Sequence, residues 1–282
     1  GDVPGPGSGR RVLLMLGKLL KYDFRSMWKQ FAFIWPAALA LALVNRFTLT
    51  LAGNGQFSDI IAGIAGLVYM AILIAMCVIA IIFVIQRFYK GLLGDEGYLM
   101  NTLPVKPWQL ITSKLVCATA ATVVSIAVAL LSIFLLAPLS AVDFADAFQE
   151  AIQVFSELIA RYHANVPLLI VEFVLLCLVG LFASYLQLYL AMAIGHLFGR
   201  NRIAMSVIAY VGINAVISVV TSVLGITFFY QFDEALAQLF HGMSDWEIWH
   251  TVMIGLILFT AVQAVVFFFF TERILHRHLN LE

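Results

Sequence analysis

The sequence predicts an all-α integral membrane protein with six transmembrane helices, an N-terminal interfacial amphipathic helix and external amphipathic helices. Of its 282 residues, 63% are hydrophobic and only 11% are charged, whereas a soluble domain is about half apolar and about a quarter charged. Long uncharged runs and a one-sided distribution of lysine and arginine indicate the same class.

Six apolar runs are long enough to cross a bilayer, for which a helix needs roughly 20 residues. A strand of a membrane barrel would need only about 10 residues with an alternating pattern, and these longer runs have uncharged interiors, so we expect helices. The predicted spans are approximately 31–51, 60–85, 115–138, 167–197, 203–230 and 249–271.

The lysine and arginine residues predict the orientation of the spans. One side of the membrane would hold only Arg46 and Arg161, and the other side would hold the remaining lysines and arginines outside the first 14 residues. Cytoplasmic loops are enriched in lysine and arginine, so the second side is predicted to be cytoplasmic. We therefore expect a multi-pass protein with both termini in the cytoplasm. The residues on the predicted cytoplasmic side are Lys18, Lys21, Arg25, Lys29, Arg87, Lys90, Lys106, Lys114, Arg200, Arg202, Arg273 and Arg277.

The first 14 residues are rich in glycine, proline and serine and are predicted to be a disordered linker or an expression remnant. Residues 15–282 are expected to form a single six-span transmembrane domain. Within it, residues 12–31 have an amphipathic helical pattern with a basic stripe, typical of a helix that lies in the membrane interface. The alternative is a simple extension of the first span. Segments 143–163 and 231–250 are also amphipathic and are expected on the outer surface.

A charged loop, residues 87–114, separates the second and third spans and is predicted to be cytoplasmic. A short helix in its first half would present leucine and tyrosine side chains beside Asp95 and Glu96, a pattern that fits docking of a partner. Pro104 and Pro107 would then fix the chain before the next helix begins near Trp108.

Motifs for catalysis are absent from the sequence. It contains no G-x-x-x-x-G-K-[ST] phosphate loop, no H-E-x-x-H and no G-x-S-x-G. Among the histidines, only His276 and His278 have the spacing of metal ligands, and on a helix these two would point apart. No metal or nucleic acid is expected to bind. We therefore expect a protein that is not itself an enzyme.

Polar residues inside the spans are candidates for a translocation path, although small and hydroxyl residues also favour helix packing. They are Ser184 and Gln187 in the fourth span, and Asn214, Ser218 and Thr221 in the fifth. Glu172 is the one acid within a span, where an ionised group costs about 3 kcal/mol on insertion scales. It is therefore a candidate functional residue.

Three segments, "MLGKLLKYDF", "RFYKGLLGDEGYLMNTLPVKPWQLITSKL" and "AMAIGHLFGRNR", resemble the permease subunit of bacterial ABC transporters of the type-2 exporter class. The resemblance runs from about Met15 to the end, and "DEGYL…TLPV" is its most specific part. It implies residence in the bacterial cytoplasmic (inner) membrane. It also implies a dimer of two permeases, identical or paired with a sister chain, assembled with two ATPase subunits that bind ATP and Mg²⁺.

The resemblance also implies roles for individual residues. A coupling helix would dock in the ATPase, with a second cytosolic contact formed by His196, Arg200 and Arg202. The coupling helix would comprise Gly94, Asp95, Glu96, Gly97, Tyr98, Leu99 and Met100.

The implied function is ATP-driven export, and the scarcity of charge in the spans favours an amphipathic, lipidic or peptide-like substrate. The long acidic segment 143–163 departs from the family pattern. The alternative is a self-sufficient secondary carrier that uses Glu172 as a proton site.

Overall fold

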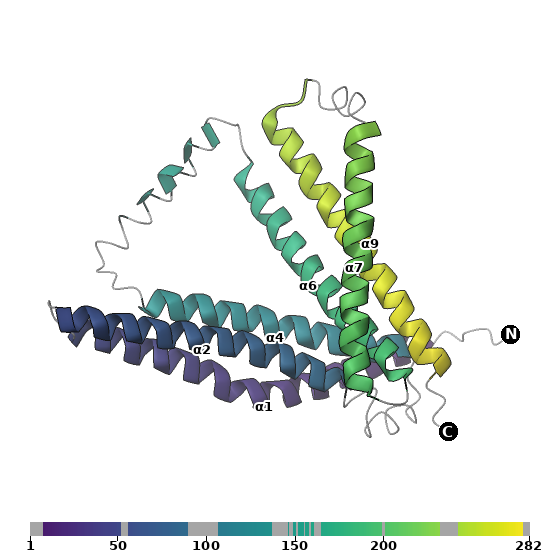
Figure 1. Ribbon diagram of the computed structural model, residues 1–282, viewed down its shortest axis with the longest axis horizontal. Helices are drawn as coiled ribbons and strands as arrows, with labels where there is room; N and C mark the ends of the chain where they lie inside the picture. The colour runs from purple at the N-terminus through teal and green to yellow at the C-terminus, as the bar shows by residue number, and fades with distance from the viewer. Residues whose placement is uncertain are drawn as a thin grey trace. The chain divides into compact units, whose positions relative to one another are not determined.

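The computed structural model describes residues 8–51, 56–89, 107–136, short pieces between 146 and 160, and residues 165–198, 201–231 and 242–278. Within this part of the chain the regular elements are all helical, which confirms the all-α prediction (Figure 1). The helices are α1 (Ser8–Leu51), α2 (Gln56–Phe88), α4 (Pro107–Leu136), α6 (Val166–His196), α7 (Arg202–Gln231) and α9 (Asp245–His278).

Each of these six helices is long and apolar enough to cross a membrane, as predicted. Several helices extend beyond the predicted spans: α1 begins at Ser8, before the predicted span at residue 31, and α9 ends at His278, beyond residue 271. At the other end of the predicted loop, α4 begins at Pro107, before the predicted span at residue 115. Proline suits the first turn of a helix because its φ angle is already helical and its missing N–H has no intrahelical acceptor there. The last eight residues of the predicted loop, 107–114, are therefore helical.

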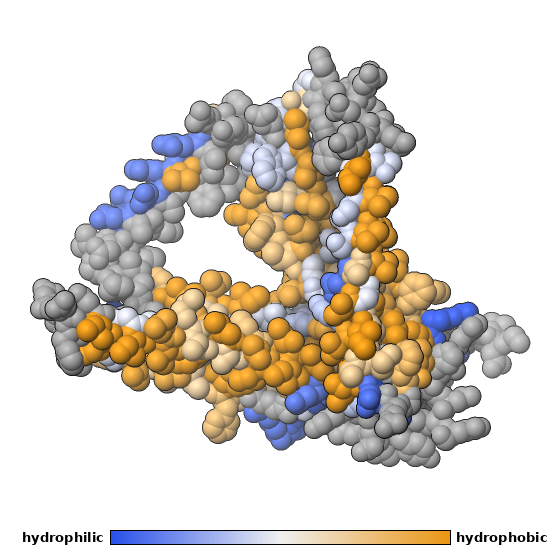
Figure 2. All heavy atoms as spheres, in the orientation of Figure 1, coloured by the Kyte–Doolittle hydropathy of each residue, from blue (hydrophilic) through white to orange (hydrophobic). Residues whose placement is uncertain are grey.

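Much of the apolar surface of the helices has no protein partner. The most buried span, Pro107–Leu135, has 33% of its residues buried, and the span Arg202–Thr227 has none. Side chains such as Phe33 and Leu67 are 85% and 73% exposed, and Figure 2 shows apolar residues along the outer surfaces of the helices. Soluble proteins rarely expose apolar patches of this extent, so lipid is the medium that these surfaces fit.

The amphipathic segment 12–31 is part of α1 and continues without a break into the first span. Its basic residues, including Lys21 and Arg25, are exposed as expected. Two members of its apolar stripe differ from the interfacial prediction, because Met27 and Phe31 are buried at 3% and 0% exposure. They contact other helices instead of lipid, so this end of α1 fits the alternative of an extended first span.

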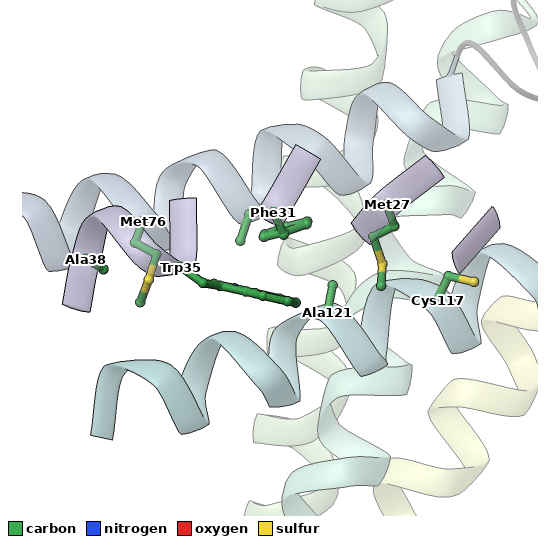
Figure 3. Close-up of a cluster of buried hydrophobic side chains, with 8 residues drawn as sticks. Met27, Phe31, Trp35, Ala38, Met76, Cys117 and Ala121 are labelled. Atoms are coloured by element: carbon green, nitrogen blue, oxygen red, sulfur yellow. The ribbon is translucent and has the colours of Figure 1, made fainter. Parts of the chain in front are cut away.

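The chain divides into two compact units, Gly1–Val142 and Asp143–Glu282. In the first unit, α1 packs against α4 and α2. Their core combines large side chains of α1 with small side chains of α4, which lets the helices approach closely. Figure 3 shows this cluster, formed by Met27, Phe31, Trp35, Ala38, Met76, Ala80, Cys117 and Ala121.

Hydrogen bonds between helices fix the register of this core. The indole Nε1 of Trp35 donates to Ser125 Oγ at 3.0 Å, which joins α1 to α4. The hydroxyls of Tyr69 and Ser132 lie 2.7 Å apart and join α2 to α4. Buried Trp and Tyr need such partners because an unpaired polar group away from water is costly.

In the second unit, α6 packs against both α9 and α7. The α6–α7 contact is closest at Gly195, where a Cβ atom would lie 2.6 Å from Ser206 Cα. Real Cβ atoms do not approach other carbons this closely, so glycine is required here. Gly195 is the first glycine of the "GHLFG" run, and its role is to permit the tight turn from α6 into α7.

The external segments are described only in part. The described residues between 146 and 160 are helical, as expected for segment 143–163. Residues 232–241 of the second segment lie outside the described residues. Its end forms the start of α9, where Ser244 N donates to Glu247 Oε2 at 2.8 Å. Glu247 N in turn donates to Ser244 Oγ at 3.4 Å, which is a capping box.

We predict that Gly195→Ala destabilises the protein, because the added methyl group forces α6 away from α7. Overpacking of this kind costs about 1–3 kcal/mol, which would be measured as a lower melting temperature in detergent. Gly212→Ala is the matched control, because nothing lies within 4 Å of its added Cβ. Equal melting temperatures for the two variants would contradict the close contact.

Candidate functional site

The candidate site lies at the ends of the two helices that flank the predicted docking loop. The expected coupling helix, Gly94 to Met100, lies outside the described residues, as does Arg200. The structure does describe where the loop departs and returns: α2 ends at Phe88 and α4 begins at Pro107. A polar network joins these two ends to α1.

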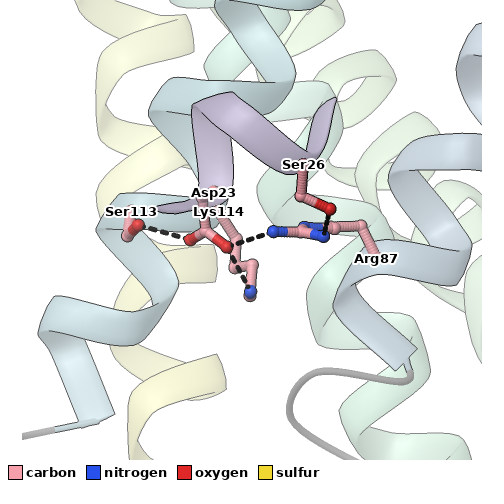
Figure 4. Close-up of polar contacts among 5 residues, drawn as sticks. All are labelled: Asp23, Ser26, Arg87, Ser113 and Lys114. Atoms are coloured by element: carbon pink, nitrogen blue, oxygen red, sulfur yellow. Dashed lines mark hydrogen bonds and ion pairs between the residues drawn. The ribbon is translucent and has the colours of Figure 1, made fainter. Parts of the chain in front are cut away.

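The centre of this network is Asp23 of α1 (Figure 4). Its Oδ1 accepts hydrogen bonds from Arg87 Nη2 at 2.6 Å and from Lys114 Nζ at 2.9 Å. Its Oδ2 accepts one from Ser113 Oγ at 2.6 Å. Arg87 also donates through Nη1 to Ser26 Oγ at 2.6 Å. One carboxylate thereby connects the last turn of α2 and the second turn of α4 to α1.

Most of this network is buried. Asp23, Ser113 and Lys114 are 5%, 1% and 4% exposed, whereas the side chain of Arg87 is 26% exposed. Burying a charge is costly unless it is paired and hydrogen-bonded. Asp23 meets this condition through both of its oxygens, and Lys114 meets it through Asp23. Each buried charge therefore depends on the other.

The pKa of the Asp23 carboxyl lies below its usual value. Burial acts to raise this pKa, because it disfavours the charged form. The positive charge of Lys114 and the hydrogen bonds from Ser113, Lys114 and Arg87 outweigh burial. Asp23 is therefore a carboxylate at neutral pH, paired with two cations.

Asp23 was not among the residues singled out from the sequence, although a signal was present. It precedes Met27 by four residues, and Met27 precedes Phe31 by four. Residues spaced in this way share one face of a helix. An acid on the apolar face, among the exposed cations Lys21 and Arg25, points to a buried ion pair.

A second buried pair lies in the other unit and includes the predicted residue Glu172. Glu172 Oε2 lies 2.7 Å from His250 Nδ1, which joins α6 to α9. Glu172 is 7% exposed. Its location inside a span was predicted from the sequence, but its partner His250 was not, because the spacing of the histidines does not show which helices pack together.

The remaining candidate residues stay predictions. His196 ends α6 and Arg202 begins α7, so both flank the short connection between these helices. Asn214, Ser218 and Thr221 are exposed on α7, and the Asn214 amide donates to Tyr210 O of its own helix at 2.9 Å.

On α6, the two polar candidates have different surroundings. The hydroxyl of Ser184, which is exposed, donates to Gly180 O of its own helix at 2.8 Å. The Nε2 atom of Gln187 is buried and has no hydrogen-bond partner within the described part of the chain. A buried donor without a partner is costly, which makes Gln187 the stronger candidate of the two for contact with a ligand.

Comparisons with models of protein families, with curated proteins and with solved structures found no match. Among the described residues, no group of three or more histidine, cysteine, aspartate or glutamate residues could hold a metal ion. The two ion pairs between helices, around Asp23 and around Glu172, are therefore the features of the described residues that bear on function.

We predict that Asp23→Asn lowers the melting temperature in detergent at neutral pH, because it leaves the buried charge of Lys114 without a counter-charge. Breaking a buried pair in this way costs about 3–5 kcal/mol.

The stabilisation by Asp23 depends on pH in a definite direction. Since folding lowers the pKa of Asp23, its stabilisation is complete above the unfolded value of about 3.9. It is lost as the pH falls through the folded value.

The difference between wild type and Asp23→Asn should therefore shrink in acid. Glu157→Gln is the control, since Glu157 is an exposed carboxylate. A variant as stable as wild type at neutral pH would show that the network does not hold these helices together.

Proposed function

We propose that this chain is the permease subunit of an ATP-driven exporter in the bacterial cytoplasmic membrane, working with a separate ATPase. The observation that carries the proposal is the buried network at the base of residues 90–106. Polar contacts hold membrane helices together in any case, and a loop that receives force from a partner has a particular need for a firm attachment to them.

The network supplies this attachment at both ends of the loop. Arg87 lies on the last turn of α2 and Lys114 on the second turn of α4, and both bind the same carboxylate of α1. A displacement of the loop by the ATPase would therefore be passed to α1, α2 and α4 together. Movement of α2 or α4 alone would separate a buried cation from Asp23, which is costly.

In this proposal, Gly94–Met100 form the coupling helix that docks in the ATPase. ATP binding closes the two ATPase subunits, and the docked helix carries that motion to the spans. His196, Arg200 and Arg202 make the smaller cytosolic contact. Two permease subunits form the translocation unit.

The apolar surfaces of the helices support a proposal for the class of substrate. Their outer faces are apolar over most of their length, and the spans carry few charges. We therefore propose that the substrate is amphipathic, lipidic or peptide-like, and that it moves along surfaces that lipid also contacts.

The first experiment is co-purification with the ATPase encoded beside this chain. We predict that the wild type retains the ATPase in detergent and that Tyr98→Ala combined with Glu96→Arg loses it, because these changes remove an apolar anchor and reverse a charge in the docking helix. The matched control is Tyr210→Ala combined with Glu157→Arg, which makes the same changes away from the loop.

The outcomes separate the alternatives. Loss of binding in the loop variant alone supports the permease and its docking site. Equal binding by both variants would move the docking site elsewhere. Transport by the chain in liposomes without any ATPase would favour the secondary carrier and contradict the proposed function.

A further inference from the structure

We propose that Glu172 and His250 form a proton-binding site that joins α6 to α9 and determines how firmly these two helices are held together. Glu172 lies in the second turn of α6 and His250 in the second turn of α9. Their side chains are 9% and 16% exposed and are joined by the 2.7 Å contact between Oε2 and Nδ1. This inference does not depend on the ATPase.

The imidazole of His250 is held from two sides. Its Nδ1 faces Glu172, and the indole ring of Trp246 meets it edge-on, with ring centroids 5.0 Å apart and an interplanar angle of 89°. Its Nε2 is buried and has no hydrogen-bond partner within the described part of the chain. When Nδ1–H donates to the carboxylate, Nε2 is the nitrogen that can take up a further proton.

The number of protons sets the charge of the pair. With a carboxylate and a neutral imidazole, the pair has one negative charge. One added proton makes it neutral, either as an ion pair or as a carboxylic acid beside an imidazole. A second added proton leaves one positive charge. A net charge in an apolar site is costly, so α6 and α9 are held most firmly by the neutral pair.

The other charged groups described on α6, α7 and α9 are either exposed or distant from the Glu172–His250 pair. On α9, Glu247 is exposed and is bonded to Ser244. Glu272, Arg273 and His276 lie more than five turns further along the same helix. On α6, Cys177 is exposed, and Tyr185, Tyr189 and His196 lie further toward its C-terminal end.

The titratable groups of α7 are also distant. Gly195 near the end of α6 contacts Ser206 near the start of α7, and Arg202 and Tyr210 each lie about one turn from Ser206 along α7. Arg202 and Tyr210 therefore lie by the end of α6 that is remote from Glu172. The described side chains of α7 beyond Tyr210 carry no charge.

The test measures two quantities, the protonation of the Glu172 carboxyl and the distance between α6 and α9. It uses the full-length chain in lipid nanodiscs over a pH range of about 5 to 9, where histidine side chains usually change charge. Infrared difference spectra report the carboxylic acid C=O stretch. Spin labels at Val171→Cys and Val252→Cys, both exposed sites on these helices, report the α6–α9 distance. The native cysteines Cys77, Cys117 and Cys177 are replaced by alanine.

We expect a carboxylic acid band that grows on acidification, disappears in Glu172→Gln and persists in Glu247→Gln, the matched control. We expect the α6–α9 distance distribution to be narrowest at intermediate pH and broader toward both ends. This pH dependence of the distance should be lost in Glu172→Gln and also in His250→Gln. If one of these variants does not fold, the other still provides the test.

A wild-type distance distribution that does not change with pH would overturn the proposal. So would a carboxylic acid band or a pH-dependent distance that survives in Glu172→Gln. Both results can be distinguished from failure of the proposed function, because neither measurement requires the ATPase or a transported substrate.

Discussion

A single buried carboxylate, that of Asp23 in α1, ties α1 to the end of α2 and to the start of α4 in the first unit. In a bilayer the hydrophobic effect does not drive helices together, since lipid tails are as apolar as the side chains, so close packing and polar contacts must do so. Asp23 bonds to both α2 and α4. The core of Met27, Phe31 and Trp35 begins one turn later on the same face of α1.

The helices of the second unit are held together by a close backbone contact and by a different ion pair. Gly195 lets the backbone of α7 approach α6, and Glu172 pairs with His250 across α6 and α9. In both units the paired charges lie outside the candidate spans or near their ends, as Asp23 does before the span Phe31–Thr48. The middle of α4 uses neutral hydroxyls such as Ser125. This distribution fits the cost of charge, which is greatest at the centre of a bilayer.

The sequence predicted the fold well because composition and span length are strong signals in membrane proteins. It also marked Glu172, because an acid within a span is conspicuous. It did not identify Asp23 or His250 as partners in buried pairs, since each lies among other polar residues away from the middle of a span. Pairing between residues such as Asp23 and Lys114, which are distant in the chain, depends on how helices pack. That arrangement is not readable from the periodicity of one helix.

The network around Asp23 constrains how the first unit can respond to a force at the loop. Two responses are available: one helix can slide past the others, or all three can move as a body. Sliding would break a buried ion pair and disturb the Trp35–Ser125 bond, at a cost of several kcal/mol. Movement as a body disturbs mainly lipid-facing surfaces, because at most a third of each span in this unit is buried. Displacing lipid costs less than separating a buried charge from its partner, so in the proposed coupling mechanism the three helices would move together.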